Sequence, residues 1–320
     1  MFELQVDLHG NLWYPNGLAQ KPVIGEFIFG YTNYFRVNEQ QRVKVPLKVK
    51  RRMTGTLIAI GGALNLDGPL LSEFFKRSGG PDGRIVILPT ASSLPDCGED
   101  YAAELARLGL RTPAQILPVH TREEAYCPDT CQAMEEATGL FITGGDQARL
   151  TGVIRGTPLY QAIRTMFYRG GTVAGTSAGT AALSNIMIAS GNSGALPQHN
   201  VATIDSGLGL IQSCIFDQHF RQRNRIGRLV NAVSRYPALI GIGVDEDTAA
   251  IIEEGQLSVM GSSVVTIVDG RALKQERLQN EIENRVTLPG QVEVQTLTAG
   301  EMYNLTRGPI LDRKQGNHAL

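Results

Sequence analysis

Short apolar runs alternate with amphipathic segments along the middle of the chain. The runs are rich in Ile, Leu and Val and several end in glycine, as expected of strands buried on both faces of a parallel sheet. They lie at 56–60, 84–88, 115–117, 139–143 and 172–174. Between them, apolar residues recur at helical spacing near 69–77, near 99–108 and after Thr157-Pro158, where a capping hydroxyl precedes an N1 proline. This alternation predicts an α/β fold with a three-layer, doubly wound and mostly parallel sheet.

Beyond Ser206 the pattern becomes richer in predicted strands. We expect a strand near 211–216, a helix near 220–234 and a hairpin over 285–297 around Pro289-Gly290. Further short β runs occur at 239–244, 248–252, 256–260 and 263–268. The C-terminal third is therefore predicted to be β-rich.

Residues 1–54 differ from the rest of the chain. They contain aromatic residues, Pro and Asn, followed by an alternating basic segment from Arg42 to Arg52, which is typical of an edge strand with one solvated face. An anionic partner for this basic segment stays open. We divide the chain into an N-terminal extension with β structure (1–54), a catalytic α/β domain (55–275) and a C-terminal hairpin region with a polar tail packed on that domain (276–320).

Composition narrows the class of protein. Hydrophobic residues make up 42% and charged residues 19%, and no apolar run is long enough to span a bilayer. The 30 Lys+Arg and 31 Asp+Glu nearly cancel, so no overall field favours nucleic acid or an anionic membrane. The first residues lack a signal-peptide pattern, and the four cysteines are too few and scattered for a disulfide framework or a zinc site. We expect a cytoplasmic protein without a metal or organic cofactor.

A G-x-S-x-G sequence, Gly175 to Gly179, lies between an apolar strand and an Ala-rich helix start. In this context the motif predicts a nucleophile elbow, a sharp turn that projects the serine hydroxyl above the carboxyl edge of the sheet. We therefore predict that Ser177 is a nucleophile. The N–H of Ala178 is the first candidate donor to an oxyanion, and the N–H of Gly62 is the second.

A serine nucleophile needs a base, usually a histidine that a carboxylate orients. Of the five histidines, His219 fits best because it follows a predicted strand at its carboxyl end. Three consecutive acids end the next strand, and of these we choose Glu246, with Asp245 in reserve. The resulting order is Ser, His, Glu. The Ser, acid, His order of the α/β-hydrolases could use only His318 as its base, in the polar tail, and stays an alternative.

Polar residues gather around His219. Arg221, Arg225 and Arg228 share one face of the helix expected after it, and Arg223 lies between them. Arginines beside a catalytic base suit the bidentate capture of substrate carboxylates, although a solvated helix face is the simpler interpretation. Asp217 and Gln218 precede the histidine and could bind a cationic or amide group, or cap the helix.

Several segments together resemble the peptidase family that holds the cyanophycinases and the aspartyl dipeptidases. They are Leu88-Pro-Thr-Ala-Ser-Ser93, Gly144-Gly-Asp-Gln147, Ala174-Gly-Thr-Ser-Ala-Gly179, Asp217-Gln-His-Phe220 with Arg223, Arg225, Gly227 and Arg228, and Gly241-Ile-Gly-Val-Asp-Glu-Asp-Thr-Ala249. The resemblance spans about 55–275 and implies a class I glutamine amidotransferase-like fold, with serine in place of cysteine. It implies a catalytic triad of Ser177, His219 and Glu246. It also implies substrate-binding roles for Gln147, Asp217, Gln218, Arg223, Arg225 and Arg228.

The resemblance also implies a substrate. Cyanophycinases cleave the poly-aspartate backbone of cyanophycin, whose β-carboxyls carry arginine, and release β-Asp-Arg dipeptides. The sequence departs from the family pattern at Gly61–Asn65, where acidic residues are expected, at Asp146, where Asn is usual, and in the extension at 1–54. An aspartyl or isoaspartyl dipeptidase and a catalytically silent binding protein therefore stay as alternatives. Family analogy also suggests a homodimer.

Overall fold

The chain forms two compact units in the computed structural model, Met1–Arg52 and Met53–Leu320. The structure describes residues 55–94, 96–194, 201–271 and 292–306, together with Gly308–Pro309 and short strands in the first unit. In the first unit, β1 (Gln5–Val6) pairs with β2 (Leu12–Trp13), and β3 (Tyr34–Asn38) pairs with β4 (Gln41–Lys44), both antiparallel. The proposed three-part division of the chain stays a prediction.

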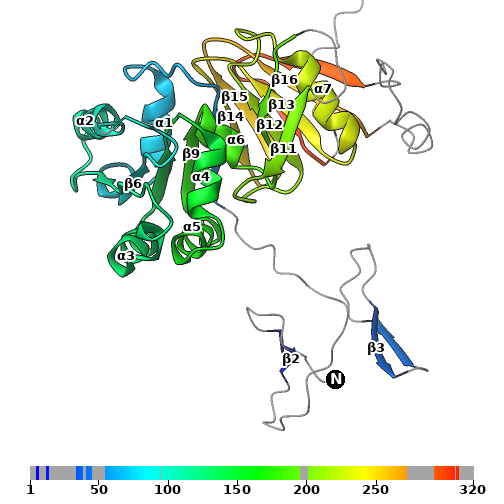
Figure 1. Cartoon of the computed structure of the whole chain (residues 1–320), viewed down its shortest axis with the longest axis horizontal. Helices are drawn as coiled ribbons and strands as arrows, with labels where there is room; N and C mark the ends of the chain where they lie inside the picture. Colours follow the sequence, from blue (N-terminus) through cyan, green and yellow to red (C-terminus); the bar gives the residue numbers. More distant parts are fainter. Residues whose placement is uncertain are drawn as a thin grey trace, which may run out of the picture. The chain divides into compact units, whose positions relative to one another are not determined.

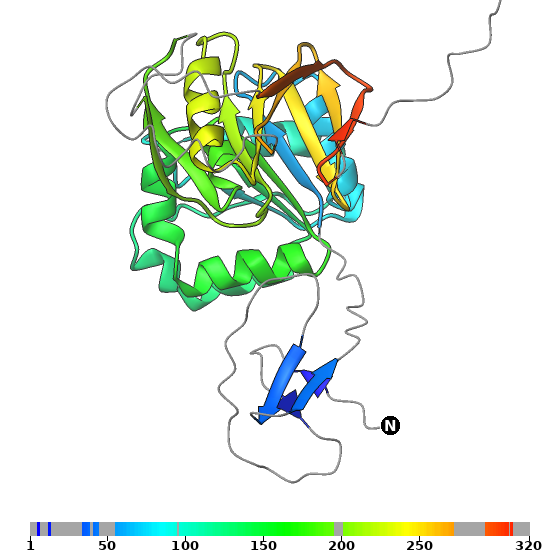
Figure 2. The same ribbon diagram turned by 90° about the vertical axis from the view of Figure 1, so that its right-hand side faces the viewer.

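A mixed sheet forms the centre of the second unit (Figures 1 and 2). Within the described residues it has nine strands in the order β19-β18-β15-β14-β5-β9-β8-β6-β7. The parallel strands are β5 (Leu57–Ile60), β6 (Ile85–Leu88), β7 (Gln115–Ile116), β8 (Gly139–Ile142) and β9 (Thr172–Thr176). The antiparallel strands are β14 (Thr248–Glu253), β15 (Gln256–Gly261), β18 (Met302–Asn304) and β19 (Gly308–Pro309).

Both faces of the parallel part are buried, which explains its continuously apolar strands. Along β5, Leu57 and Ala59 face one hydrophobic core, and Ile58 and Ile60 face another. The core around Ile58 includes apolar side chains of α1 (Pro69–Arg77) and α2 (Glu99–Arg107). The core around Leu57 includes those of α3 (Pro128–Glu136), α4 (Gln147–Ile154), α5 (Pro158–Tyr168) and α6 (Ala178–Ala182). Short 3-10 turns lie at Gly80–Asp82 and Glu124–Tyr126.

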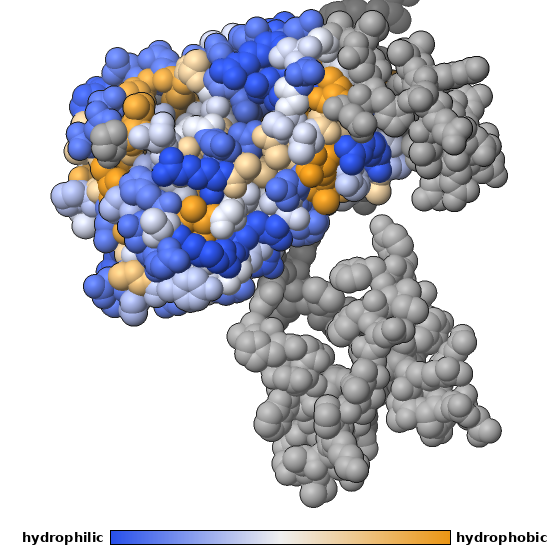
Figure 3. All heavy atoms as spheres, in the orientation of Figure 1, coloured by the Kyte–Doolittle hydropathy of each residue, from blue (hydrophilic) through white to orange (hydrophobic). Residues whose placement is uncertain are grey.

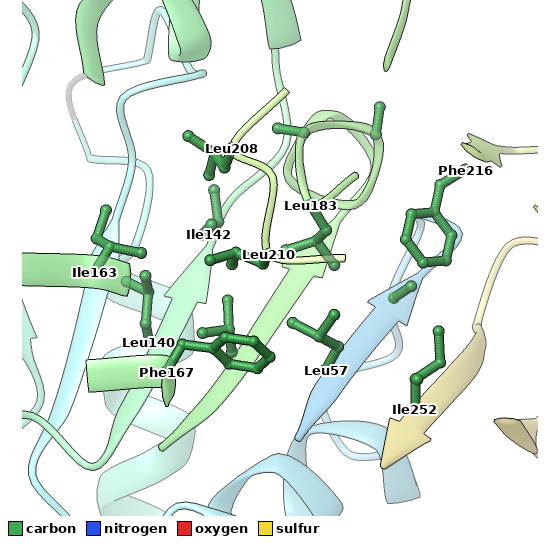
Figure 4. Close-up of a cluster of buried hydrophobic side chains, with 14 of the residues drawn as sticks. Leu57, Leu140, Ile142, Ile163, Phe167, Leu183, Leu208, Leu210, Phe216 and Ile252 are labelled. Carbon is green, nitrogen blue, oxygen red and sulfur yellow. The ribbon is translucent and has the colours of Figure 1, made fainter. Parts of the chain in front are cut away.

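A second sheet packs against the same core. It consists, among the described residues, of β12 (Cys214–Gln218), β13 (Ile240–Val244), β16 (Val265–Asp269) and β17 (Glu293–Leu297), with β12 and β13 parallel and the other pairs antiparallel. Figure 4 shows Phe216 of this sheet beside Leu183 and above Leu57 and Ile252 of the first sheet. The other face packs against α7 (Ile226–Arg235) and the hairpin of β10 (Ile186–Gly191) and β11 (Ala202–Ser206).

The predicted fold class, a mostly parallel α/β sheet with helices on both faces, is confirmed. The predicted helix over 220–234 is wrong at its start, because α7 begins only at Ile226. His219 and Asn224 have φ values of 46° and 47°, in the left-handed region, so the chain turns here before the helix can form. Arg221 and Arg223 therefore lie in a turn and Arg225 is the N-cap of α7, so the predicted helical face of Arg221, Arg225 and Arg228 is wrong. The turn predicted at Pro289-Gly290 lies outside the described residues.

The surface of the described part is mixed. Figure 3 shows small apolar areas among mostly hydrophilic residues on the face it presents. The large apolar side chains that are exposed include Leu94, Tyr126, Val294 and Met302. None of the described helices is both long and apolar enough to cross a membrane.

Candidate active site

Ser177 lies at the sharp turn between β9 and α6. Its φ and ψ are 52° and −111°, a conformation that non-glycine residues rarely adopt. The neighbouring glycines let the helix approach the sheet: a Cβ on Gly179 would lie 2.5 Å from the Ile142 carbonyl oxygen, and one on Gly175 would lie 2.5 Å from the Gly179 carbonyl carbon. The Ser177 N–H donates to the Ile60 carbonyl at 3.0 Å. The G-x-S-x-G sequence thus forms the strained turn that its context predicts.

His219 follows β12 and faces Ser177. Its Nε2 lies 2.9 Å from Ser177 Oγ, and its N–H donates to the Gly61 carbonyl at 2.7 Å. Gly62 leaves room for the imidazole, because a Cβ at this position would lie 2.3 Å from His219 Cε1. The serine from the first sheet and the histidine from the second therefore meet where β9 and β12 end.

Glu246 completes a chain of hydrogen bonds. Its Oε1 lies 2.6 Å from His219 Nδ1, and its side chain is 34% exposed against 10% for His219. Asp245, the reserve choice, is fully buried and points elsewhere: it accepts from the N–H and Nε of Arg221 at 3.0 and 2.6 Å. The structure thus brings together Ser177, His219 and Glu246, and their catalytic roles stay predictions.

The surroundings of His219 favour its neutral form. Burial is the main factor that lowers the pKa of the imidazole, and the charges of Arg223 and Arg225 lower the pKa further. The hydrogen bond and charge of Glu246 oppose these effects without cancelling them. A neutral imidazole whose Nδ1 donates to Glu246 leaves Nε2 free to accept the proton of Ser177 Oγ.

The two candidate oxyanion donors lie next to Ser177 in the chain and next to the His219 ring. Ala178 is the first residue of α6, so its N–H has no acceptor one turn earlier in the helix. Gly62 lies beside the His219 ring. Gly144, at the end of β8, approaches the serine itself, since a Cβ there would lie 3.4 Å from Ser177 Cβ. The assignments of Ala178 and Gly62 stay predictions, and Gly144 is a neighbour of the nucleophile that sequence reasoning did not single out.

Four of the predicted substrate-binding residues form one buried network. Arg228 Nε donates to Asp217 Oδ2 at 2.6 Å, and both side chains are almost fully buried. Arg225 Nη1 donates to Gln218 Oε1 at 2.9 Å and lies 3.5 Å from Asp217 Oδ1. Burial, together with the charges of Arg228 and Arg223, lowers the pKa of Arg225 to about 10, against the opposing effect of Asp217. The network leaves the Asp217 carboxylate already paired with an arginine.

The other two predicted substrate-binding residues lie differently. Gln147 Nε2 donates to the carbonyls of Ile188 and Ala189 at 3.1 and 2.6 Å, so its amide holds β10 against α4. Arg223 is exposed, and its side chain makes no hydrogen bond or ion pair with any described residue. Its charge nevertheless acts on His219. Among the described residues, Arg223 is thus a cation without a partner close to the candidate base.

The described residues contain no group of three or more His, Cys, Asp or Glu placed to hold a metal ion. Cys97, Cys127, Cys131 and Cys214 are all free thiols.

Comparison with protein families places the chain in a known group. Residues 57–260, which include Ser177, His219 and Glu246, match the model of peptidase family S51. The chain belongs to peptidase family S51. The protein is therefore a hydrolase that acts as a peptidase, and the predicted family is confirmed.

Three similar proteins are named cyanophycinase. The chain is 36% identical to the cyanophycinase of Trichormus variabilis over 277 residues, which cover 85% of this chain and 92% of that protein. It is 37% identical to the cyanophycinase of Synechococcus elongatus over 78% of this chain and 79% of the relative. It is 39% identical to that of Geminocystis herdmanii over 70% and 84%.

A solved structure shows the same fold. A peptidase from an acI-B1 Actinobacterium superposes with a TM-score of 0.59 at 24% sequence identity, over 79% of this chain and 98% of that chain.

Proposed function

We propose that this S51 peptidase hydrolyses the backbone of cyanophycin through Ser177, His219 and Glu246. The observation that carries the proposal is the continuous hydrogen-bond chain from Ser177 Oγ through the imidazole to Glu246, at 2.9 and 2.6 Å. The relatives named cyanophycinase, which match most of this chain, support the choice of substrate.

The geometry supports acyl transfer in two stages. Ser177 Oγ attacks the backbone carbonyl carbon while His219 Nε2 takes its proton, and Glu246 stabilises the imidazolium that forms. The N–H groups of Ala178 and Gly62 are the proposed donors to the oxyanion. His219 then gives the proton to the leaving amine, and a water molecule, deprotonated by the same imidazole, releases the acyl group from Ser177.

The charges around the site suit the chemistry of the polymer. Each side chain of cyanophycin ends in an arginine that carries both a free carboxylate and a guanidinium group. Arg223, exposed and unpaired among the described residues, is the proposed partner of a substrate carboxylate. Gln147, Asp217, Gln218, Arg225 and Arg228 are proposed to complete the binding site. Because Asp217 is already paired with Arg228, we infer that its part is to hold that arginine in place.

Two expectations accompany this assignment. The resemblance suggests a homodimer and a cytoplasmic location. Light scattering on the purified chain measures its mass in solution, and a mass near 34.7 kDa would mean a monomer and remove the first expectation.

The test is turnover of insoluble cyanophycin by the wild type and by Ser177→Ala. We expect the wild type to clear the suspension and release β-Asp-Arg, identified by mass spectrometry, and Ser177→Ala to keep its fold and release only a trace over long incubation. Ser258→Ala is the matched control, because Ser258 is half-buried on β15 and is outside the hydrogen-bond chain. Cleavage of isoaspartyl dipeptides but not of the polymer would replace the proposed substrate. Full activity of Ser177→Ala would refute the mechanism.

A further inference from the structure

His219 and Glu246 both lie just past the last paired residues of the second sheet. The β12–β13 ladder ends with Gln218 opposite Val244, and the β13–β16 ladder ends with Val244 opposite Val265. A few backbone hydrogen bonds continue past this end: the Phe220 N–H donates to the Val244 carbonyl at 3.2 Å, and the N–H groups of His219 and Asp247 donate to the Gly61 and Gly62 carbonyls. Side-chain contacts add to these bonds in bringing His219 Nδ1 and Glu246 Oε1 within 2.6 Å of each other.

The first contact is an ion pair between the residues next to the site. Asp245, which precedes Glu246, is fully buried and accepts from Arg221, two residues after His219. Ser263 extends the contact: its Oγ accepts from Arg221 Nη2 at 2.7 Å and donates to Asp245 Oδ2 at 2.8 Å. A buried carboxylate is tolerated only when it is paired and hydrogen-bonded, so this geometry has a strong energetic preference.

The second contact joins Gln222 and Glu246, the residues that follow Arg221 and Asp245. The Glu246 N–H donates to Gln222 Oε1 at 3.2 Å, and the Glu246 carbonyl accepts from Thr248 Oγ1 at 3.1 Å. The backbone of Glu246 is thus fixed on both sides by side chains. Arg221 and Gln222, from the turn that carries His219, contact Asp245 and Glu246 in the same order.

We propose that Arg221 and Asp245 are positioning residues that align Glu246 with the His219 imidazole. The proposal rests on the proposed function, since it concerns the same site. The Arg221 guanidinium, for which the sequence also suggested capture of a substrate carboxylate, is instead held by Asp245 and Ser263. The pairing of Arg221 with Asp245 adds a side-chain link to the backbone bonds between the two segments, and so tunes the hydrogen bond between His219 Nδ1 and Glu246 Oε1.

The test compares two arginine-to-alanine variants near opposite ends of the β13–β16 pair. Arg221→Ala removes the guanidinium from the ion pair with Asp245, while the backbone N–H of residue 221 and Ser263 Oγ still donate to that carboxylate, so the variant should fold. Arg271→Ala removes a similar pair, with Asp269, which lies opposite Ile240 at the far end of β13. The two sites are separated by the length of the strand, and Arg271 has no contact with the triad.

Two readouts are independent of the natural substrate. A fluorophosphonate probe forms a bond between Ser177 Oγ and phosphorus with loss of fluoride, and its labelling rate separates into a maximal rate and a half-saturating concentration. The downfield proton resonance of imidazole Nδ1–H reports the bond to Glu246, and is assigned by its absence in His219→Ala. We expect Arg221→Ala to lower the maximal rate by about ten- to a hundredfold, with the half-saturating concentration unchanged, and to shift or broaden the resonance.

Arg271→Ala should leave both readouts at the wild-type values. Wild-type values in Arg221→Ala, or equal losses in the two variants, would overturn the positioning role. Absence of labelling at Ser177 in the wild type would instead refute the proposed function. Arg221→Lys, which keeps a cation beside Asp245, should recover part of the rate. If Arg221→Ala does not fold, the decisive comparison is between Arg221→Lys and Arg221→Gln. A maximal labelling rate of Arg221→Lys no higher than that of Arg221→Gln would then overturn the proposal.

Discussion

The two halves of the candidate site are held in different ways. On the serine side the main chain and glycines do the positioning: Ser177 is fixed by its φ of 52°, by its hydrogen bond to Ile60 and by the close approach of Gly179 to β8. On the other side, charged and polar side chains add to a few backbone hydrogen bonds in holding the segments of His219 and Glu246 beyond the end of their sheet. A backbone turn is specified by a few adjacent residues, whereas a set of side-chain contacts depends on residues far apart in the sequence.

This contrast predicts different consequences of mutation. Changes to the glycines around Ser177 should act mainly through packing and therefore on stability. Changes on the other side should act mainly on the imidazole and therefore on rate and pH dependence.

The largest effect is expected from Glu246→Gln. The amide can still occupy the site but cannot stabilise an imidazolium, and it can hold the ring in the wrong tautomer, so kcat should fall by about 10⁴-fold. Steady-state kinetics on cyanophycin, with circular dichroism to establish folding, measures this. Glu253→Gln, at the exposed end of β14, serves as the control and should retain its activity. A loss of less than tenfold for Glu246→Gln would remove Glu246 from the triad.

A stability effect is expected from Gly179→Ala. The added Cβ would meet the Ile142 carbonyl oxygen at 2.5 Å, so the helix or strand must move, and the free energy of unfolding should fall by about 1–3 kcal/mol. Gly152→Ala, in α4, is the matched control. Nothing lies within 4 Å of its added Cβ, and it should raise stability by about 0.5–1 kcal/mol. Urea denaturation measures both, and equal changes in the two variants would contradict the packing argument.

The smallest effect is expected from Arg223→Ala, and it concerns pH. Besides burial, the Arg223 and Arg225 charges lower the pKa of His219, and Glu246 raises it. Removing the Arg223 charge should raise that pKa, so the imidazole becomes protonated at higher pH and the acid limb of the kcat profile moves upward. The shift should shrink at high salt, because Arg223 is exposed. If the acid limb of the Arg223→Ala profile does not move at low salt, the Arg223 charge does not act on His219.

The same contrast explains what the sequence could reveal. The buried strands and the elbow at Ser177 are visible locally, because apolar runs and glycines carry the information. The start of α7 was not predicted, although asparagine and histidine adopt the left-handed conformation more readily than most residues and both His219 and Asn224 do so here. The buried pairing of Asp217 with Arg228, eleven residues apart, was also hidden, and both appeared as separate candidates for substrate binding. Three adjacent acids could not show that Asp245 pairs with Arg221 and that Glu246 meets His219.

The two short helices α3 and α4 and the hairpin of β10 and β11 were likewise not predicted. The hairpin is fixed largely by distant contacts, such as those of Gln147 with Ile188 and of Arg228 with Gly191. Local sequence carries little information about elements that depend on such tertiary contacts.

The central claim is that Ser177 and His219 act as one unit. The most direct test is the kcat for cyanophycin cleavage of Ser177→Ala, His219→Ala and the double variant, followed by mass spectrometry over long incubations. Residues that act together lose their contribution once either is removed, so we expect the double variant to be no slower than the slower single variant. If the two losses multiply in the double variant, the residues act independently and the proposed mechanism is wrong.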